Sequence, residues 1–170
     1  MENKDKTAEE QTLTAQQRTA QYETIVRQTA GLMEGEMDNP VGLLANVAAL
    51  LKEAFDDYFW VGFYIVHCGR LRLGPFQGPL ACLSIPHGRG VCGTAWAEKR
   101  TLVVPDVEAF PGHIACSSRS RSEIVVPILR DGEVVAVIDV DSTALDAFHA
   151  ADQVGLEALA EQLSPVFPAR

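Results

Sequence analysis

Apolar residues recur at helical spacing in three long segments of the chain. The first follows a capping box, in which Thr14 and Gln17 can satisfy the free backbone N–H groups of a helix start. In the second, Asn39 suits the N-cap and Pro40 the first helical position. The third segment is His149–Leu163. Its predicted inward residues are Val154, Leu156, Leu159 and Leu163.

Five shorter apolar runs predict the strands of a sheet. In the first run, Tyr58–Val66, the residues on both faces are apolar, so we expect both faces to be covered. No regular crossover helices separate the runs, and the pattern therefore predicts an α+β fold: a largely antiparallel sheet with helices packed on it. The predicted strands are Tyr58–Val66, Leu71–Phe76, Thr101–Val104, Ile124–Leu129 and Val134–Val140.

Two irregular segments interrupt this pattern. Gln77–Ser84 is rich in Gly and Pro and predicts a crossing segment before a short helix at Val91–Glu98. Asp106–Ser122 has no consistent period and contains four serines. A loop of that length in a compact domain is usually functional.

The composition narrows the class of protein. A chain of 170 residues favours one domain, which we place at residues 13–170. The net charge of −9 argues against nucleic acid as a partner, and the longest apolar runs are too short to cross a membrane. Met1–Gln11 is polar and lacks the apolar stretch of a signal peptide. We therefore expect a cytoplasmic protein with a disordered tail at residues 1–12.

The chain has four cysteines, which in a cytoplasmic protein are more often catalytic or metal-binding than cross-linked. Cys116 lies late in the long loop beside His113 and Arg119, whose positive charge would favour its thiolate. Burial as a small loop residue is an equal alternative. Cys92 begins the short helix, where backbone N–H groups favour a thiolate, although simple core packing is slightly preferred.

Cys82 lies in the crossing segment, where a thiol can move as a resolving thiol must. The gaps that separate Cys82, Cys92 and Cys116 lack the short paired spacing of structural zinc sites. We therefore expect no metal.

Asp139 and Asp141 are two residues apart near the end of a predicted strand, so their side chains share one face. Two neighbouring carboxylates repel each other, and one pKa should rise unless a cation lies between them. The alternative is a solvated strand end. Glu123 on the preceding strand joins the pair only if the hairpin register allows it.

Several motifs resemble those of one known family. They are Trp60-Val61-Gly62-Phe63-Tyr64, Leu73 to Gly78, Cys82, Gly88 to Gly93, Pro105-Asp106-Val107, Phe110 to Cys116, Ser122 to Pro127 and Ile138 to Ser142. From Asn39 to Leu163 the chain resembles the free methionine-(R)-sulfoxide reductases, which are single GAF-domain enzymes. Two residues depart from the resemblance. His87 stands where we expect a bulky apolar residue, and Cys68 has no matching role.

The resemblance implies a GAF fold with about six strands, and a homodimer. It also implies roles for three thiols: Cys116 as nucleophile, Cys82 as resolving thiol and Cys92 as a third redox-active cysteine. The residues matching the family's substrate-binding acids are Glu123, Asp139 and Asp141, and those matching its aromatic pocket are Trp60 and Tyr64.

The implied activity is reduction of free L-methionine-(R)-sulfoxide through a sulfenic acid on Cys116 and an intramolecular disulfide. A thioredoxin-like dithiol would then reduce that disulfide, with no metal or organic cofactor. The alternative is a non-catalytic GAF sensor of a small molecule or of redox state. Consumption of NADPH with thioredoxin, thioredoxin reductase and free methionine sulfoxide separates the two.

This function requires one particular register in the hairpin formed by the predicted strands Ile124–Leu129 and Val134–Val140. A two-residue turn of Asp131 and Gly132 pairs Arg130 with Glu133 and leaves Glu123 on the wrong face. A three-residue turn that includes Arg130, with Gly132 in the left-handed region, places Glu123 opposite Asp139. We therefore predict the three-residue turn.

Overall fold

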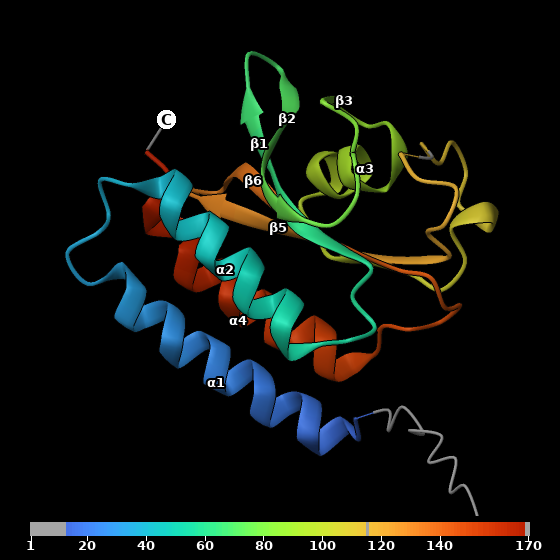
Figure 1. Ribbon diagram of the computed structural model, residues 1–170. Helices are drawn as coiled ribbons and strands as arrows, with labels where there is room; N and C mark the ends of the chain where they lie inside the picture. The colour runs from blue at the N-terminus through green and yellow to red at the C-terminus, as the bar shows by residue number, and fades with distance from the viewer. Residues whose placement is uncertain (1–12, 115, 169–170) are drawn as a thin grey trace, which may run out of the picture.

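The computed structural model describes residues 13–114 and 116–168, so the predicted tail at residues 1–12 lies outside the described residues. Helices and strands are mixed along the chain (Figure 1). The α-helices are α1 (Ala15–Met33), α2 (Pro40–Ala54), α3 (Gly90–Glu98) and α4 (Ala150–Leu163). The strands are β1 (Trp60–His67), β2 (Arg70–Gln77), β3 (Ser84–Pro86), β4 (Leu102–Val104), β5 (Ser122–Arg130) and β6 (Glu133–Ser142). Two short 3₁₀ helices are Val107–Ala109 and Ser164–Val166.

The strands form one six-stranded sheet in the order β3-β2-β1-β6-β5-β4. Every pair of neighbouring strands is antiparallel, which confirms the predicted α+β class. Helices α1, α2 and α4 lie on one side of the sheet, and α3 lies on the other (Figure 1). No helix of the described residues is long and apolar enough to span a membrane.

Strand β1 has apolar cover on both faces, as its sequence predicted. Val61 and Phe63 belong to the core that contains the three long helices. Trp60 and Tyr64 point to the opposite side, into a second core that includes Val91 of α3. The side chains that alternate along the central strands therefore face two different apolar layers.

The helix starts follow the predicted local signals. Thr14 and Gln17 form the capping box of α1, and the side chain of Asn39 accepts a hydrogen bond at the start of α2. Helix α4 differs in one respect: Val154, predicted to face inward, is 65% exposed. The buried stripe of α4 instead runs through Asp152, Gly155, Leu156, Leu159, Ala160 and Leu163.

A buried polar network joins α1 and α4. The Arg18 guanidinium contacts the carboxylate of Asp152, with Nη2 2.6 Å from Oδ1, and also bonds Asp57. Tyr22 donates a hydrogen bond of 2.8 Å to Asp152 and shares another with Tyr58. Each charged group in this cluster has an oppositely charged partner, as burial of charge requires.

The predicted three-residue turn between β5 and β6 is wrong. Arg130 pairs with Glu133 across a two-residue turn, and both Asp131 and Gly132 have positive φ. The register then shifts by one residue at a bulge, between the Leu129–Val134 and Ile128–Ala136 pairs. As a result Glu123 lies opposite Asp141 rather than opposite Asp139. The three acids still share one face of the sheet, because the bulge supplies the shift that the turn does not.

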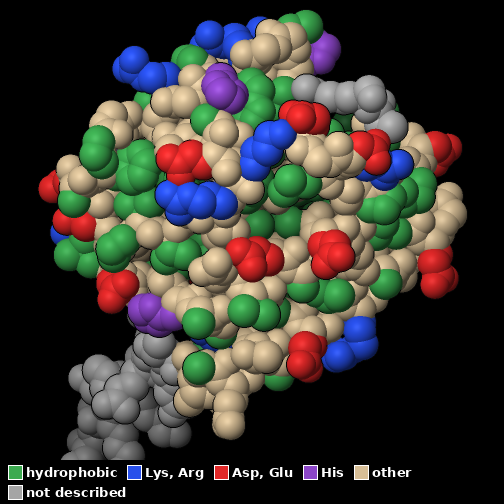
Figure 2. All heavy atoms as spheres, turned by 180° about the vertical axis from the view of Figure 1, so that it is seen from behind, with side chains coloured by type: hydrophobic (Ala, Val, Ile, Leu, Met, Phe, Trp, Pro, Cys, Tyr) green, Lys and Arg blue, Asp and Glu red, His purple; other side chains and the backbone are tan. Residues whose placement is uncertain are grey.

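On the face of the molecule shown in Figure 2, acidic and basic side chains are interspersed with apolar ones. Basic residues on this face do not gather into a stripe of the kind that nucleic-acid-binding proteins carry.

Candidate active site

A cavity of about 40 Å³ lies against the α3 face of the sheet. Its walls come from α3, the crossing segment after β2, and the loop before β5, and its floor is formed by β1, β5 and β6. Seven of the eight predicted site residues line it: Trp60, Tyr64, Cys92, Cys116, Glu123, Asp139 and Asp141. The eighth, Cys82, adjoins the cavity through its disulfide bond to Cys116.

The disulfide connects the two irregular segments of the chain. Cys82 is half-buried in the crossing segment, and Cys116 is exposed in the long loop, with 5.3 Å between their Cα atoms. Cys68 is a free, exposed cysteine at the tip of the β1–β2 hairpin. Two thiols 34 positions apart in the chain thus form one bond beside the cavity, while Cys68 takes no part in it.

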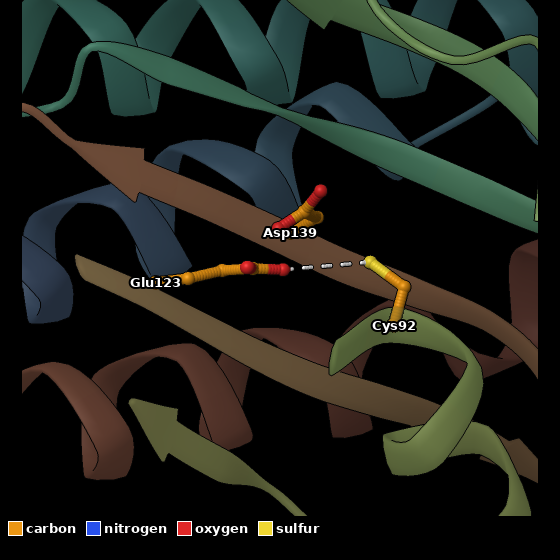
Figure 3. A group of neighbouring side chains, drawn as sticks. All are labelled: Cys92, Glu123 and Asp139. Atoms are coloured by element: carbon orange, nitrogen blue, oxygen red, sulfur yellow. Dashed lines mark hydrogen bonds between the residues drawn. The ribbon is translucent and has the colours of Figure 1, made fainter. Parts of the chain in front are cut away.

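Cys92 is a free, buried cysteine on the cavity side of α3. Its thiol lies 3.9 Å from Oε1 of Glu123, and the two side chains point toward each other (Figure 3). Burial, together with the neighbouring carboxyl groups of Asp139 and Glu123, raises the pKa of the Cys92 thiol well above its usual value. Core packing, the slightly preferred interpretation of Cys92, is therefore what the structure shows: Cys92 is buried in the same core as Val91, and its burial and negative neighbours outweigh the effect of the helix start.

The three acids form a carboxyl cluster on the adjacent strands β5 and β6, in which Glu123 and Asp139 are buried and Asp141 is half-buried. Burial and the charge of the neighbouring acids raise the pKa of both Glu123 and Asp139 well above the usual carboxyl range. Burial also raises the pKa of Asp141, to about 6, although a hydrogen bond with Ser120 works in the opposite direction. The cluster can therefore hold protons near neutral pH, and it can bind a positive group that relieves the repulsion.

Trp60 and Tyr64 connect the sheet to the segment that carries Cys82. Tyr64 donates a 3.0 Å hydrogen bond to the carbonyl oxygen of Cys82, and the Trp60 indole donates one of 3.2 Å to Pro79. Their rings stack with centroids 5.9 Å apart. These contacts position the crossing segment over the cavity while the two rings form its wall.

The gap that Gly62 leaves in β1 is occupied by another ring. A Cβ atom at Gly62 would lie 2.4 Å from Cβ of Phe76, and the Phe76 ring stacks on Trp60 with centroids 5.3 Å apart. Glycine at this position therefore leaves room for Phe76, whose ring packs against Trp60 of the aromatic wall.

Three further residues contribute to the site: Ser120, which was not singled out from the sequence, and His113 and Arg119, which were expected only as positive charges beside Cys116. His113 Nε2 lies 3.9 Å from Oε2 of Glu123, and burial lowers the pKa of His113, which favours its neutral form. Ser120 lines the cavity beside Asp141. The Arg119 guanidinium lies over the ring of Phe59, 4.6 Å from its centre, and holds the loop against the residue that precedes β1. The sequence places all three residues near the site, but their partners are distant in the chain.

His87, the predicted departure from the family pattern, lies outside this cavity. It is exposed and its ring meets the ring of Trp96 on α3 edge-on, with centroids 4.5 Å apart. The ring of His87 therefore packs against an aromatic side chain of α3, although histidine is polar.

The fold and the cavity define a GAF domain. The sequence model of the GAF domain family matches residues 39–166, which include every strand and the whole site.

Relatives over most of the chain refine this class. The chain is 56% identical over 134 residues to GAF domain-containing protein A of Dictyostelium discoideum, covering 78% of this chain and 84% of that protein. It is 44% identical over 149 residues to the free methionine-R-sulfoxide reductase of Escherichia coli, covering 88% and 90% of the two chains. A structure of the free methionine-R-sulfoxide reductase of Neisseria meningitidis, in complex with its substrate, superposes with a TM-score of 0.84 at 51% identity, covering 88% and 90%. The chain belongs to the GAF domain family, within the branch of the free methionine-R-sulfoxide reductases.

Proposed function

We propose that this protein reduces free L-methionine-(R)-sulfoxide to L-methionine. The observation that carries the proposal is a single cavity lined by both Cys116 and the three carboxyl groups of Glu123, Asp139 and Asp141. Relatives named for this reaction, which match most of the chain, support the same activity and supply the preference for the R form.

In the first half-reaction, the Cys116 thiolate attacks the sulfur of the sulfoxide. A carboxylic acid of the cluster gives its proton to the sulfoxide oxygen. The raised pKa values of Glu123 and Asp139 support this role, because they keep a proton available near neutral pH. The substrate sulfur gains two electrons and leaves as the thioether of methionine, while the oxygen remains on Cys116 as a sulfenic acid.

In the second half-reaction, the Cys82 thiolate attacks the sulfur of the Cys116 sulfenic acid. The new S–S bond forms as the hydroxyl group leaves and takes a proton to become water. The Cys82–Cys116 bond of the structure corresponds to this product. A thioredoxin-like dithiol then restores both thiols by disulfide exchange. Cys92 keeps its predicted role as a third thiol, which replaces Cys82 more slowly.

The acids also explain how a free amino acid would be recognised. Buried carboxylates without a cation repel one another, and the substrate's ammonium group supplies the missing charge. The stacked rings of Trp60 and Tyr64 offer an apolar wall for the methyl and methylene groups. The rest of the proposed description, a homodimer in the cytoplasm, stays a prediction.

The direct test supplies the protein with thioredoxin, thioredoxin reductase, NADPH and free methionine sulfoxide of separated R and S forms. We expect NADPH consumption with the R form and the appearance of one methionine per NADPH. A sensor domain would bind ligand without turnover, so the lack of NADPH consumption with intact, reducible protein would contradict the proposal.

The surroundings of Cys82 predict where the reductant binds. Leu80 and Leu83 flank this half-cystine and are 90% and 77% exposed. An external thiolate can reach the disulfide only from the solvent side, so its carrier must cover these side chains. We expect Leu83→Asp to raise the KM for thioredoxin about tenfold and to leave the KM for methionine sulfoxide unchanged.

Val154→Asp is the matched control for this prediction, because Val154 is 65% exposed but lies on α4, on the opposite side of the sheet. An equal effect of the two substitutions on the KM for thioredoxin would place the reductant elsewhere. Leu80 is avoided as the test position because it also lines the cavity.

A further inference from the structure

Three side chains from different elements converge at the floor of the cavity: Cys92 of α3, Glu123 of β5 and Asp139 of β6 (Figure 3). The Cys92 sulfur and one carboxylate oxygen from each acid all lie within 4.8 Å of one another. All three side chains are buried, with residue exposures of 3%, 6% and 6%. All three are site residues expected from the sequence, but no metal was predicted, because the cysteines lack the short paired spacing of structural zinc sites.

A second observation distinguishes this group from an ordinary acidic cluster. Oδ1 of Asp139 is buried and has no hydrogen-bond partner among the described residues. A buried carboxylate oxygen without a partner is destabilising, so a ligand that binds it removes that cost. Among the described residues, one basic side chain lies within ion-pair distance of Glu123: His113, whose Nε2 is 3.9 Å from Oε2 of Glu123.

We propose that Cys92, Glu123 and Asp139 form a reversible binding site for a thiophilic divalent cation of the Zn²⁺ class. A thiolate and two carboxylates give three protein ligands, which leaves one tetrahedral position for water. The sulfur ligand and the low ligand number disfavour Ca²⁺ and Mg²⁺, which prefer six or more oxygen ligands. Zinc–ligand bonds of about 2.0–2.3 Å require ligand atoms roughly 3.5 Å apart. The side chains would therefore close by up to about 1.3 Å, while the thiol proton and any proton held by the two carboxyl groups pass to solvent.

The site remains available in the disulfide form of the protein. The disulfide uses Cys82 and Cys116, so the Cys92 thiol stays free. The cavity of about 40 Å³ holds an ion with a few waters, even though it is far smaller than a pocket for an amino acid. Metal binding can therefore be measured without substrate or turnover. A further consequence rests on the proposed function: the metal would compete with the substrate's ammonium group for Glu123 and Asp139.

The test uses the full chain in its disulfide form and carries Cys68→Ser, so that Cys92 is the one remaining free thiol. Titration with Cd²⁺, a spectroscopic substitute for Zn²⁺, is expected to produce thiolate-to-metal charge-transfer absorption that saturates at one ion per chain. Adding Cys92→Ser should abolish the absorption and weaken binding at least tenfold. Glu123→Gln and Asp139→Asn should each weaken binding with the absorption retained, and Glu108→Gln at an exposed position should change nothing.

Circular dichroism and thermal unfolding establish that each variant is folded before it is titrated. Absence of the charge-transfer absorption, or an unchanged affinity in folded Cys92→Ser, would overturn the metal site. A separate assay adds Zn²⁺ to the reduced enzyme, where we expect inhibition that excess substrate or a chelator reverses. Stoichiometric binding without inhibition would preserve the metal site and instead remove these acids from substrate recognition, so the two hypotheses fail separately.

Discussion

Replacement of Cys116 by serine is expected to abolish turnover of methionine sulfoxide. Besides Cys116, the cavity is lined by the thiol of Cys92. The pKa of Cys92 is raised well above its usual value, so its thiolate is scarce. A serine hydroxyl at position 116 is a far weaker nucleophile toward sulfur than a thiolate. The measurement is methionine formed per enzyme, both in a single turnover with reduced protein and in the coupled assay.

Two other serine variants serve as controls for the Cys116 assignment. Cys82→Ser should form about one methionine per chain and then stall as the sulfenic acid or as a slow disulfide with Cys92. Cys68→Ser should behave as the native protein, because Cys68 lies exposed at a hairpin tip. Near-native turnover by Cys116→Ser would refute the assignment of the nucleophile.

Acetylation of the substrate's amino group is expected to cause the second large effect. The acetamide carries no positive charge, so it leaves Glu123, Asp139 and Asp141 without their proposed partner. Each unpaired buried carboxylate costs about 1–3 kcal/mol, which corresponds to roughly 5- to 150-fold in kcat/KM. The comparison of kcat/KM for free and N-acetylated (R)-sulfoxide measures this loss.

The variant Asp141→Asn makes this test specific to the carboxyl cluster. It removes one charge opposite Glu123, so it should lower kcat/KM for the free amino acid and narrow the ratio between the two substrates. Asp106→Asn, at the start of a surface 3₁₀ helix, should leave the ratio unchanged. Equal kcat/KM values for the two substrates in the native protein would mean that the acids do not bind the ammonium group.

Much of the fold follows from local signals in the sequence. The Thr14 capping box and the Asn39-Pro40 pair mark helix starts with side-chain chemistry that needs no distant partner. The strands and the α+β class follow from apolar runs without intervening crossover helices. Val154 does not fit the helical spacing of Leu156, Leu159 and Leu163, so the prediction that it faces inward was wrong. The buried positions near it are Asp152 and Gly155, which an apolar pattern does not reveal because neither has an apolar side chain.

The register of the second hairpin could not be read from the sequence for a different reason. Strand β6 is apolar from Val134 to Ile138 and buried on both faces, so its pattern has no alternation to fix the phase. An extra residue in such a run leaves no trace in the sequence. The three acids nevertheless share one face of the sheet, as predicted. The observed bulge and the predicted three-residue turn each shift the register by one residue, in opposite directions, and either shift brings Glu123 to the face of Asp139 and Asp141.

The candidate site was predictable as a set of residues but not as an electrostatic environment. The sequence places Cys92 at a helix start, and only the tertiary structure brings Glu123 and Asp139 against it. The pKa of a buried group depends on such neighbours more than on its own element. For the same reason the sequence did not reveal the contact between His113 and Glu123.

The bond between Cys82 and Cys116 has a kinetic consequence. It ties the crossing segment to the long loop across a cavity of about 40 Å³, whereas pockets for small molecules measure roughly 300–1,000 Å³. Under the proposed function, a chain that has just completed its chemistry has no room for a second sulfoxide. Substrate and reductant must then visit alternately, in a ping-pong sequence, and a high concentration of methionine sulfoxide cannot trap the oxidised protein in a dead-end complex.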